Sequence, residues 1–160
     1  MTERIRADLE AQCRVRMQRP HLRVISVEPI PEGHSGFTYF VTIDEGDGPR
    51  RFVLRLPPPG ARIAGPADVV RQGRIMAALH SAGLPVPAIP VLTPDAVVDG
   101  RPCVLMEAVA GDRVDKTGGA QKPLDIARPA SEVLTTLHAR APSGPGIGDG
   151  REVQAKLAEW

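Results

Sequence analysis

Residues 31–56 read PEGHSGFTYFVTIDEGDGPRRFVLRL, and this stretch decides the fold. Its segments 37–43 and 51–56 are rich in aromatic and β-branched side chains, which favour β-strands. Between them lies DEGDGP, whose acidic residues and glycines form a strong turn signal. The stretch therefore predicts two antiparallel strands joined as a hairpin, with a glycine-rich turn at 33–36 before the first of them.

Periodic apolar patterns on both sides of the hairpin predict further elements. The predicted strands or extended segments cover residues 22–30, 88–98 and 101–109. The predicted helices are an amphipathic one over 3–17, one opened by Gly65-Pro66 and closed by Gly83, one over 124–139, and one that begins in the last ten residues. The order of these elements predicts an α+β fold.

Composition excludes several classes of protein. The net charge is +1, from 20 basic and 19 acidic residues with interspersed signs, which argues against an arginine-rich RNA binder. No apolar run approaches the roughly 18 residues that span a bilayer, and the first residues lack the apolar core of a signal peptide. We therefore expect a cytoplasmic protein with no nucleic-acid and no membrane partner.

The two cysteines, Cys13 and Cys103, lie in different predicted elements. The sequence contains no CxxC motif and no histidine cluster near either residue. Buried free thiols are therefore expected here, in preference to a disulfide or a metal site.

Strand alternation gives the second strand of the hairpin two different faces. Val53 and Arg55 share one face, and Phe52, Leu54 and Leu56 share the other. The face with a valine and an arginine suits an anion attached to a flat ring, and backbone N–H groups of the glycine-rich turn would reach phosphate oxygens without obstruction. The same residues also fit an exposed strand arginine beside an ordinary turn, and spacing alone leaves both interpretations open.

The helix before Gly83 carries one polar side chain in an apolar stripe. By helical spacing Gln72 shares a face with Val69, Met76 and Leu79. Because this face is directed inward, we expect Gln72 to find a hydrogen-bond partner there.

Four stretches, taken in order, resemble the amino-terminal lobe of the aminoglycoside phosphotransferase family, small-molecule kinases with a protein-kinase-like fold. They are EGHSGFTYFV, RRFVLRLPPPG, ADVVRQGRIMAALHSAGLPVP and GRPCVLMEAVAG. The resemblance covers about residues 22–160, and its specificity lies in the ordered set, since the glycine–serine turn alone is a weak signal. The VLR-x-P pattern is most similar to the branch that includes kinase-like domains fused to acyl-CoA dehydrogenases.

The resemblance implies an architecture. A five-stranded antiparallel sheet with one packed helix would form the kinase-like lobe, followed by a hinge and the first helices of an incomplete second lobe. The implied boundaries are an amino-terminal extension over 1–21, the lobe over 22–106, and the hinge with the start of the helical lobe over 107–160.

The resemblance also assigns phosphate-binding roles. Arg55 stands where such kinases have the lysine that binds the α- and β-phosphates, and Gln72 stands where a glutamate pairs with that lysine. Arginine keeps its charge and the glutamine oxygen can accept from it, so the pair fits either a matched variant or a weakened nucleotide site. The loop over the ATP phosphates would comprise Gly33, His34, Ser35 and Gly36.

On the adenine side, the resemblance assigns four residues. Val53 would cover the ring and Met106 would border the back of its pocket. The Glu107 carbonyl and the Val109 N–H would bond the adenine edge.

The family's catalytic His-Gly-Asp motif, the asparagine that follows it and a later metal-binding aspartate are not found in the 160 residues. The resemblance therefore places no catalytic residue and no metal ligand in this chain, and the Mg²⁺ ligands are expected beyond Trp160. It implies the ATP-binding part of a phosphotransferase that transfers the γ-phosphate to a hydroxyl of a small-molecule substrate, inactive as this fragment. The alternative is a non-catalytic kinase-like module. An incomplete lobe would also expose apolar surface, which predicts self-association through that interface.

Overall fold

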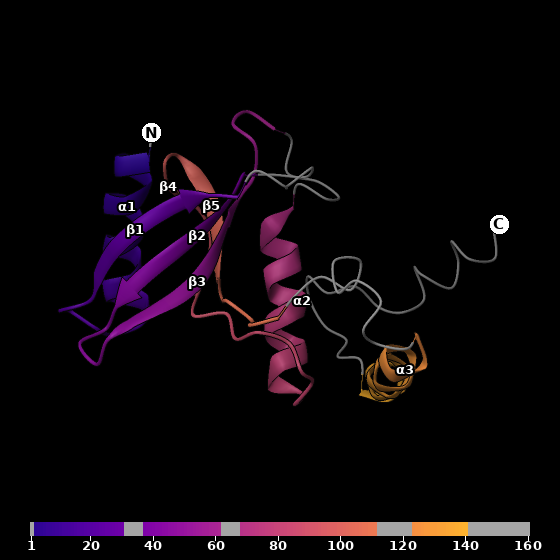
Figure 1. Cartoon of the computed structure of the whole chain (residues 1–160). Coiled ribbons are helices and arrows are strands. Elements are labelled where there is room, and N and C mark those ends of the chain that lie inside the picture. Colours follow the sequence, from indigo (N-terminus) through magenta and orange to yellow (C-terminus); the bar gives the residue numbers. More distant parts are fainter. Residues whose placement is uncertain (1, 31–36, 62–67, 112–122, 141–160) are drawn as a thin grey trace.

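The computed structural model describes residues 2–30, 37–61, 68–111 and 123–140 (Figure 1). The elements in chain order are α1 (Thr2–Arg16), β1 (Arg23–Pro29), β2 (Phe37–Asp44), β3 (Pro49–Leu56), α2 (Val69–Ser81), β4 (Val91–Val98), β5 (Arg101–Glu107) and α3 (Pro123–Arg140). This order confirms the predicted α+β class. The helix expected in the last ten residues lies outside the described residues.

The five strands form one antiparallel sheet, as predicted, and their order in the sheet is β1-β2-β3-β5-β4. The hairpin between β2 and β3 turns through Gly46 and Gly48, whose φ angles of 108° and 117° favour glycine. The Gly46 N–H donates to Asp44 Oδ1 at 2.9 Å, which closes the turn. Turn chemistry therefore fixes the register that brings β2 beside β3.

Helix α1 packs on one face of the sheet (Figure 1), although the sequence predicted only one packed helix, α2. Ile5, Leu9 and Cys13 recur every four residues, are 0% exposed and join the core of that sheet face. The helix is also fastened to the chain that follows, because the Val24 N–H donates to Glu10 Oε2 at 2.8 Å. The segment expected to be an extension is thus part of the core of the sheet.

Helix α2 packs on the opposite face, against β4 and β5 (Figure 1). It begins after Asp68, whose Oδ1 accepts from the Arg71 N–H at 2.9 Å and caps the helix. Gly65-Pro66, expected to open this helix, lie outside the described residues. The helix ends before Gly83, whose φ of +78° is the left-handed value typical of a residue just after a helix.

Helix α3 lies on the α2 side of the molecule, apart from the sheet (Figure 1). In the part of the chain that the structure describes, no helix combines the length and apolarity that crossing a membrane requires.

Candidate functional site

The two faces of β3 differ in exposure, as strand alternation predicted. Phe52, Leu54 and Leu56 are 1%, 0% and 0% exposed, because they face the core that α1 covers. Val53 and Arg55 lie on the other face and are half-buried. These two side chains are therefore partly exposed, on the face where α2 packs against β4 and β5.

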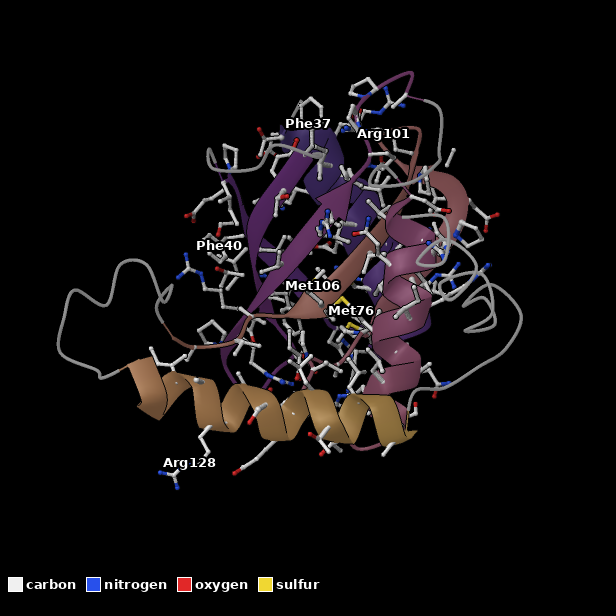
Figure 2. The ribbon with its side chains drawn as sticks, turned by 90° about the vertical axis from the view of Figure 1, so that its right-hand side faces the viewer. Phe37, Phe40, Met76, Arg101, Met106 and Arg128 are labelled. Carbon is white, nitrogen blue, oxygen red and sulfur yellow. The ribbon has the colours of Figure 1, made fainter. Side chains whose placement is uncertain are left out.

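An apolar platform crosses three strands of the accessible face. Strand register places Phe40 of β2 opposite Val53, and Val53 opposite Met106 of β5, all three half-buried. In Figure 2, Met106 lies near Met76 of α2 and Phe40 lies farther from that helix. Sequence reasoning missed Phe40, although counting alternate residues back from Val53 through the hairpin would have found it. The platform offers a flat ring an apolar surface.

Arg55 and Gln72 meet at the α2 end of this platform. Arg55 Nη1 donates to Gln72 Oε1 at 2.6 Å, which joins β3 to α2. The helical pattern predicted an inward hydrogen-bond partner for Gln72, and the family resemblance implied that this partner is Arg55. Because its donor is a charged guanidinium, the bond is of the stronger kind and holds the cation in one orientation.

Gly73 lets α2 approach the sheet closely enough for that hydrogen bond. A Cβ at this position would lie 2.7 Å from Val104 Cγ2 and 2.8 Å from Leu92 Cδ1, far inside normal contact distance. Gly73 is buried and directly follows Gln72 in the helix. Sequence reasoning missed this residue; its signal was a glycine within an apolar helical face.

In the hinge at the end of β5, two backbone N–H groups are hydrogen-bonded to other parts of the fold. The Glu107 N–H donates to Ala88 O at 3.0 Å, and the Ala108 N–H donates to Arg51 O at 3.2 Å. Val109 is 74% exposed, and within the described residues its N–H has no backbone acceptor. The Glu107 carboxylate bonds Arg50 Nη2 at 2.7 Å, so this side chain ties the hinge to β3.

A cation lies over the outer part of the platform. Arg51 Cζ is 3.9 Å from the centroid of the Phe40 ring, at cation–π distance. Because Arg51 also accepts the Ala108 N–H through its carbonyl, this residue links the platform to the hinge.

Four of the predicted site residues, Gly33, His34, Ser35 and Gly36, lie outside the described residues. Among the residues that are described, no three His, Cys, Asp or Glu side chains gather in a group that would hold a metal ion.

Both cysteines are buried free thiols, as predicted. Burial raises the pKa of Cys13 from 9.0 to about 12, and burial likewise raises the pKa of Cys103 to about 12. The two thiols therefore remain protonated at neutral pH and do not act as nucleophiles in the folded protein.

A separate cavity of about 280 Å³ opens between the α1 side of the sheet and the end of α2. Met17, Phe52, His80 and Glu107 are among the residues that line it. Of the residues assigned to the candidate site, the cavity shares Glu107, and it has neither Arg55 nor Gln72 in its lining.

Comparison with known proteins supports the resemblance inferred from the sequence. Residues 26–160 match the model of the phosphotransferase enzyme family (APH). The chain is 37% identical over 79 residues to acyl-CoA dehydrogenase family member 10 of Mus musculus, a match that covers 49% of this chain and 7% of that protein. A crystal structure from Ralstonia eutropha, described as that of an aminoglycoside phosphotransferase, superposes with a TM-score of 0.59 at 25% identity.

The structural match covers 82% of this chain and 37% of the Ralstonia eutropha chain, so this chain spans less than half the length of either relative. The match includes the kinase-like lobe with its five-stranded antiparallel sheet. The sequence, the fold and these matches agree: the chain belongs to the APH phosphotransferase enzyme family.

Proposed function

We propose that this chain is the ATP-binding amino-terminal part of a cytoplasmic small-molecule phosphotransferase, which transfers the γ-phosphate of ATP to a hydroxyl of its substrate. One observation carries the proposal: the 2.6 Å hydrogen bond between Arg55 and Gln72. It occupies the place where, by the family resemblance, a lysine on the third strand pairs with a glutamate on the helix.

On the phosphate side, Arg55 supplies the positive charge. Its guanidinium binds phosphate oxygens in a planar, bidentate manner that a lysine ammonium does not match. Gln72 orients the guanidinium through its amide oxygen and brings no counter-charge of its own. The Arg55 charge is therefore available to the α- and β-phosphates of the nucleotide.

On the adenine side, the proposal rests on the apolar platform and the hinge. Val53 covers one face of the base, Met106 borders its inner edge, and Phe40 extends the apolar surface outward. The Glu107 carbonyl accepts from the adenine amino group and the Val109 N–H donates to a ring nitrogen. The availability of the Val109 N–H among the described residues supports this assignment.

The chemistry itself is assigned to the carboxy-terminal part of the intact protein. There the family's catalytic loop and metal-binding aspartate would hold Mg²⁺ and position the substrate hydroxyl for in-line attack on the γ-phosphate. We infer that the 160-residue chain alone binds nucleotide weakly and transfers no phosphate.

A second candidate function is a non-catalytic kinase-like module that binds ATP poorly and holds a partner. The replacement of the family's charged pair by Arg55 and a neutral Gln72 is the observation that favours it.

Calorimetric titration of the full-length protein with ATP and Mg²⁺ separates the two candidates. Loss of Arg55 removes a charged hydrogen-bond donor worth about 1.5–3 kcal/mol, so Arg55→Ala should weaken ATP binding roughly 10- to 150-fold. The double variant Arg55→Lys/Gln72→Glu restores the family's ion pair and should retain binding.

The matched control is Arg14→Ala, because Arg14 likewise donates to an uncharged carbonyl oxygen, the backbone oxygen of Leu22 at 2.9 Å, but on the α1 side of the sheet. It should leave ATP affinity unchanged. Absence of ATP binding in the wild-type protein would support the non-catalytic module. Equal ATP affinities of the wild type and Arg55→Ala would show that Arg55 does not contribute to ATP binding.

A further inference from the structure

The cavity at the end of α2 has an apolar interior that the nucleotide site does not use. Its volume of about 280 Å³ corresponds to about nine water molecules at roughly 30 Å³ each. The interior therefore has room for a small apolar group of about nine non-hydrogen atoms. Apolar side chains from the end of α1, from β3, from α2 and from the segment before β4 line it, among them Met17, Phe52, Ala77, Ile89 and Pro90.

Three charged side chains meet at this cavity: Glu45 in the turn after β2, Arg50 of β3 and Glu107 of β5. Arg50 Nη2 donates to Glu107 Oε1 at 2.7 Å, and Arg50 Nη1 donates to Glu45 Oε1 at 3.4 Å. The side chain of Glu45 is 11% exposed, so its charge is partly shielded from water. Two carboxylates therefore share one guanidinium, and the three side chains together carry a net charge of −1.

Two further polar side chains in the lining offer hydrogen-bond acceptors. His80 Nδ1 lies 2.9 Å from the Val86 carbonyl oxygen, which can only accept, so Nδ1 carries the hydrogen and Nε2 of the neutral ring is an acceptor. Ser81 Oγ donates to Ala77 O at 3.0 Å, and its oxygen can still accept. The polar part of the cavity is thus complementary to a group that donates hydrogen bonds and carries a positive charge.

The aromatic ring in the lining also suits a cation. Arg50 Cζ lies 5.5 Å from the centroid of the Phe52 ring, which is cation–π distance. The Phe52 side chain is 1% exposed, so little water competes for this ring. One positive charge already lies over Phe52 beside the two carboxylates, and the excess negative charge favours a second one nearby.

We propose that this cavity is a binding site for a small primary amine with an apolar body. The ammonium group has three donors and no acceptor, and it binds the carboxylates of Glu45 and Glu107. The apolar body packs against Phe52 and Met17 in the interior. The inference goes beyond the proposed nucleotide site, because it uses the Glu107 carboxylate and not the Glu107 carbonyl, so either proposal can fail without the other.

The test is a titration of the full-length protein with phenethylamine, followed through the methionine methyl signals. Met17 lines the cavity and reports binding there, whereas Met106 lies on the platform and serves as the internal control. The comparison probes are phenethyl alcohol, which has the same size and no charge, and phenylacetate, which is an anion. We expect a saturable shift of Met17 alone, with about five- to tenfold higher affinity for the amine than for the alcohol and no saturable shift with phenylacetate.

Substitution of Glu45 tests the charge contribution. Glu45→Gln keeps the size of the side chain and should weaken phenethylamine binding about three- to tenfold, while the affinity for phenethyl alcohol changes less than about twofold. The matched control is Glu10→Gln, because Glu10 is 19% exposed and paired with Arg14 at 2.7 Å, but on α1. It should change neither affinity.

Substitution of Ala77 tests the location, because Ala77→Leu places a larger side chain in the lining and should abolish the saturable Met17 shift with the amine and the alcohol. Should this variant not fold, Glu45→Gln decides. The inference is overturned by the absence of a saturable Met17 shift at millimolar phenethylamine, by equal affinities for the three probes, or by an unchanged amine affinity in Glu45→Gln. A shift of Met106 in place of Met17 would put the amine on the platform and would overturn it as well.

Discussion

Substituting Gly73 by alanine tests whether close packing of α2 on the sheet positions Gln72. The new Cβ would lie 2.7 Å and 3.2 Å from the two methyl carbons of Val104 and 2.8 Å from Leu92 Cδ1. Normal carbon–carbon contacts are about 3.5–4.0 Å, so the helix and sheet must separate by nearly 1 Å locally. Leu92 can rotate its terminal methyl away, but Val104 is β-branched and 1% exposed, and has nowhere to move.

Two opposing terms set the size of the effect. Alanine favours the helix over glycine by about 1 kcal/mol. Overpacking a buried contact costs about 1–3 kcal/mol. We therefore expect Gly73→Ala to lower the free energy of unfolding by about 1 kcal/mol, because the packing term exceeds the gain in helix propensity. A displacement of about 1 Å would also stretch the Arg55–Gln72 hydrogen bond from 2.6 Å to beyond its useful range.

Urea denaturation of the wild type, Gly73→Ala, Val104→Ala and the double variant measures this balance as a double-mutant cycle. In the Val104→Ala background both methyl groups of Val104 are gone and Leu92 can rotate its terminal methyl away, so adding the alanine at 73 should be neutral or stabilising. If Gly73→Ala stabilises the otherwise unchanged protein by about 1 kcal/mol, α2 does not depend on this close approach and the reasoning is refuted.

Three further predictions concern the scaffold. Asp68→Ala removes the cap of α2 and should cost about 1 kcal/mol of stability in urea denaturation, whereas Asp68→Asn should cost little; equal losses would contradict the capping role. Leu9→Ala should cost about 2–5 kcal/mol, since Leu9 is 0% exposed, and a loss within experimental error would show that α1 is dispensable to the core. The pKa values of the two thiols rise from 9.0 to about 12 on folding, so between these pH values the folded protein retains protons that the unfolded chain releases. The free energy of unfolding should therefore fall between pH 9 and 12. Cys13→Ala should make this decline shallower, and an unchanged slope would contradict the buried-thiol interpretation.

The sequence was sufficient for features that depend on local patterns. The acidic glycine turn after β2 fixed the hairpin, and alternation along β3 put Val53 and Arg55 on the face away from Phe52. The strand and helix periods predicted which faces carry Arg55 and Gln72, and the family resemblance implied that the two side chains pair.

Features that depend on tertiary packing were not predictable in this way. Nothing local to Gly73 shows that a strand lies within reach of its missing Cβ, and nothing local to Arg101 shows that it is buried. For α1, the four-residue spacing of Ile5, Leu9 and Cys13 indicated an apolar face, but the surface that covers it is set by the sheet topology. The same topology brings Phe37 of β2 and Pro57, which follows β3, to Arg101 of β5, although the three residues lie far apart in the sequence.

The location of ATP on the Val53–Arg55 face can be tested directly with methionine methyl groups. The 160 residues contain four methionines, and in ¹³C-methyl-labelled protein single substitutions identify the signals of Met106 and Met17. Met106 pairs with Val53 on the proposed adenine face, whereas Met17 lines the separate cavity on the α1 side. We predict that titrating the full-length protein with ATP and Mg²⁺ shifts the Met106 signal in a saturable way and leaves that of Met17 unchanged. A shift of Met17 without Met106, or no shift of either signal at millimolar ATP, would contradict the account.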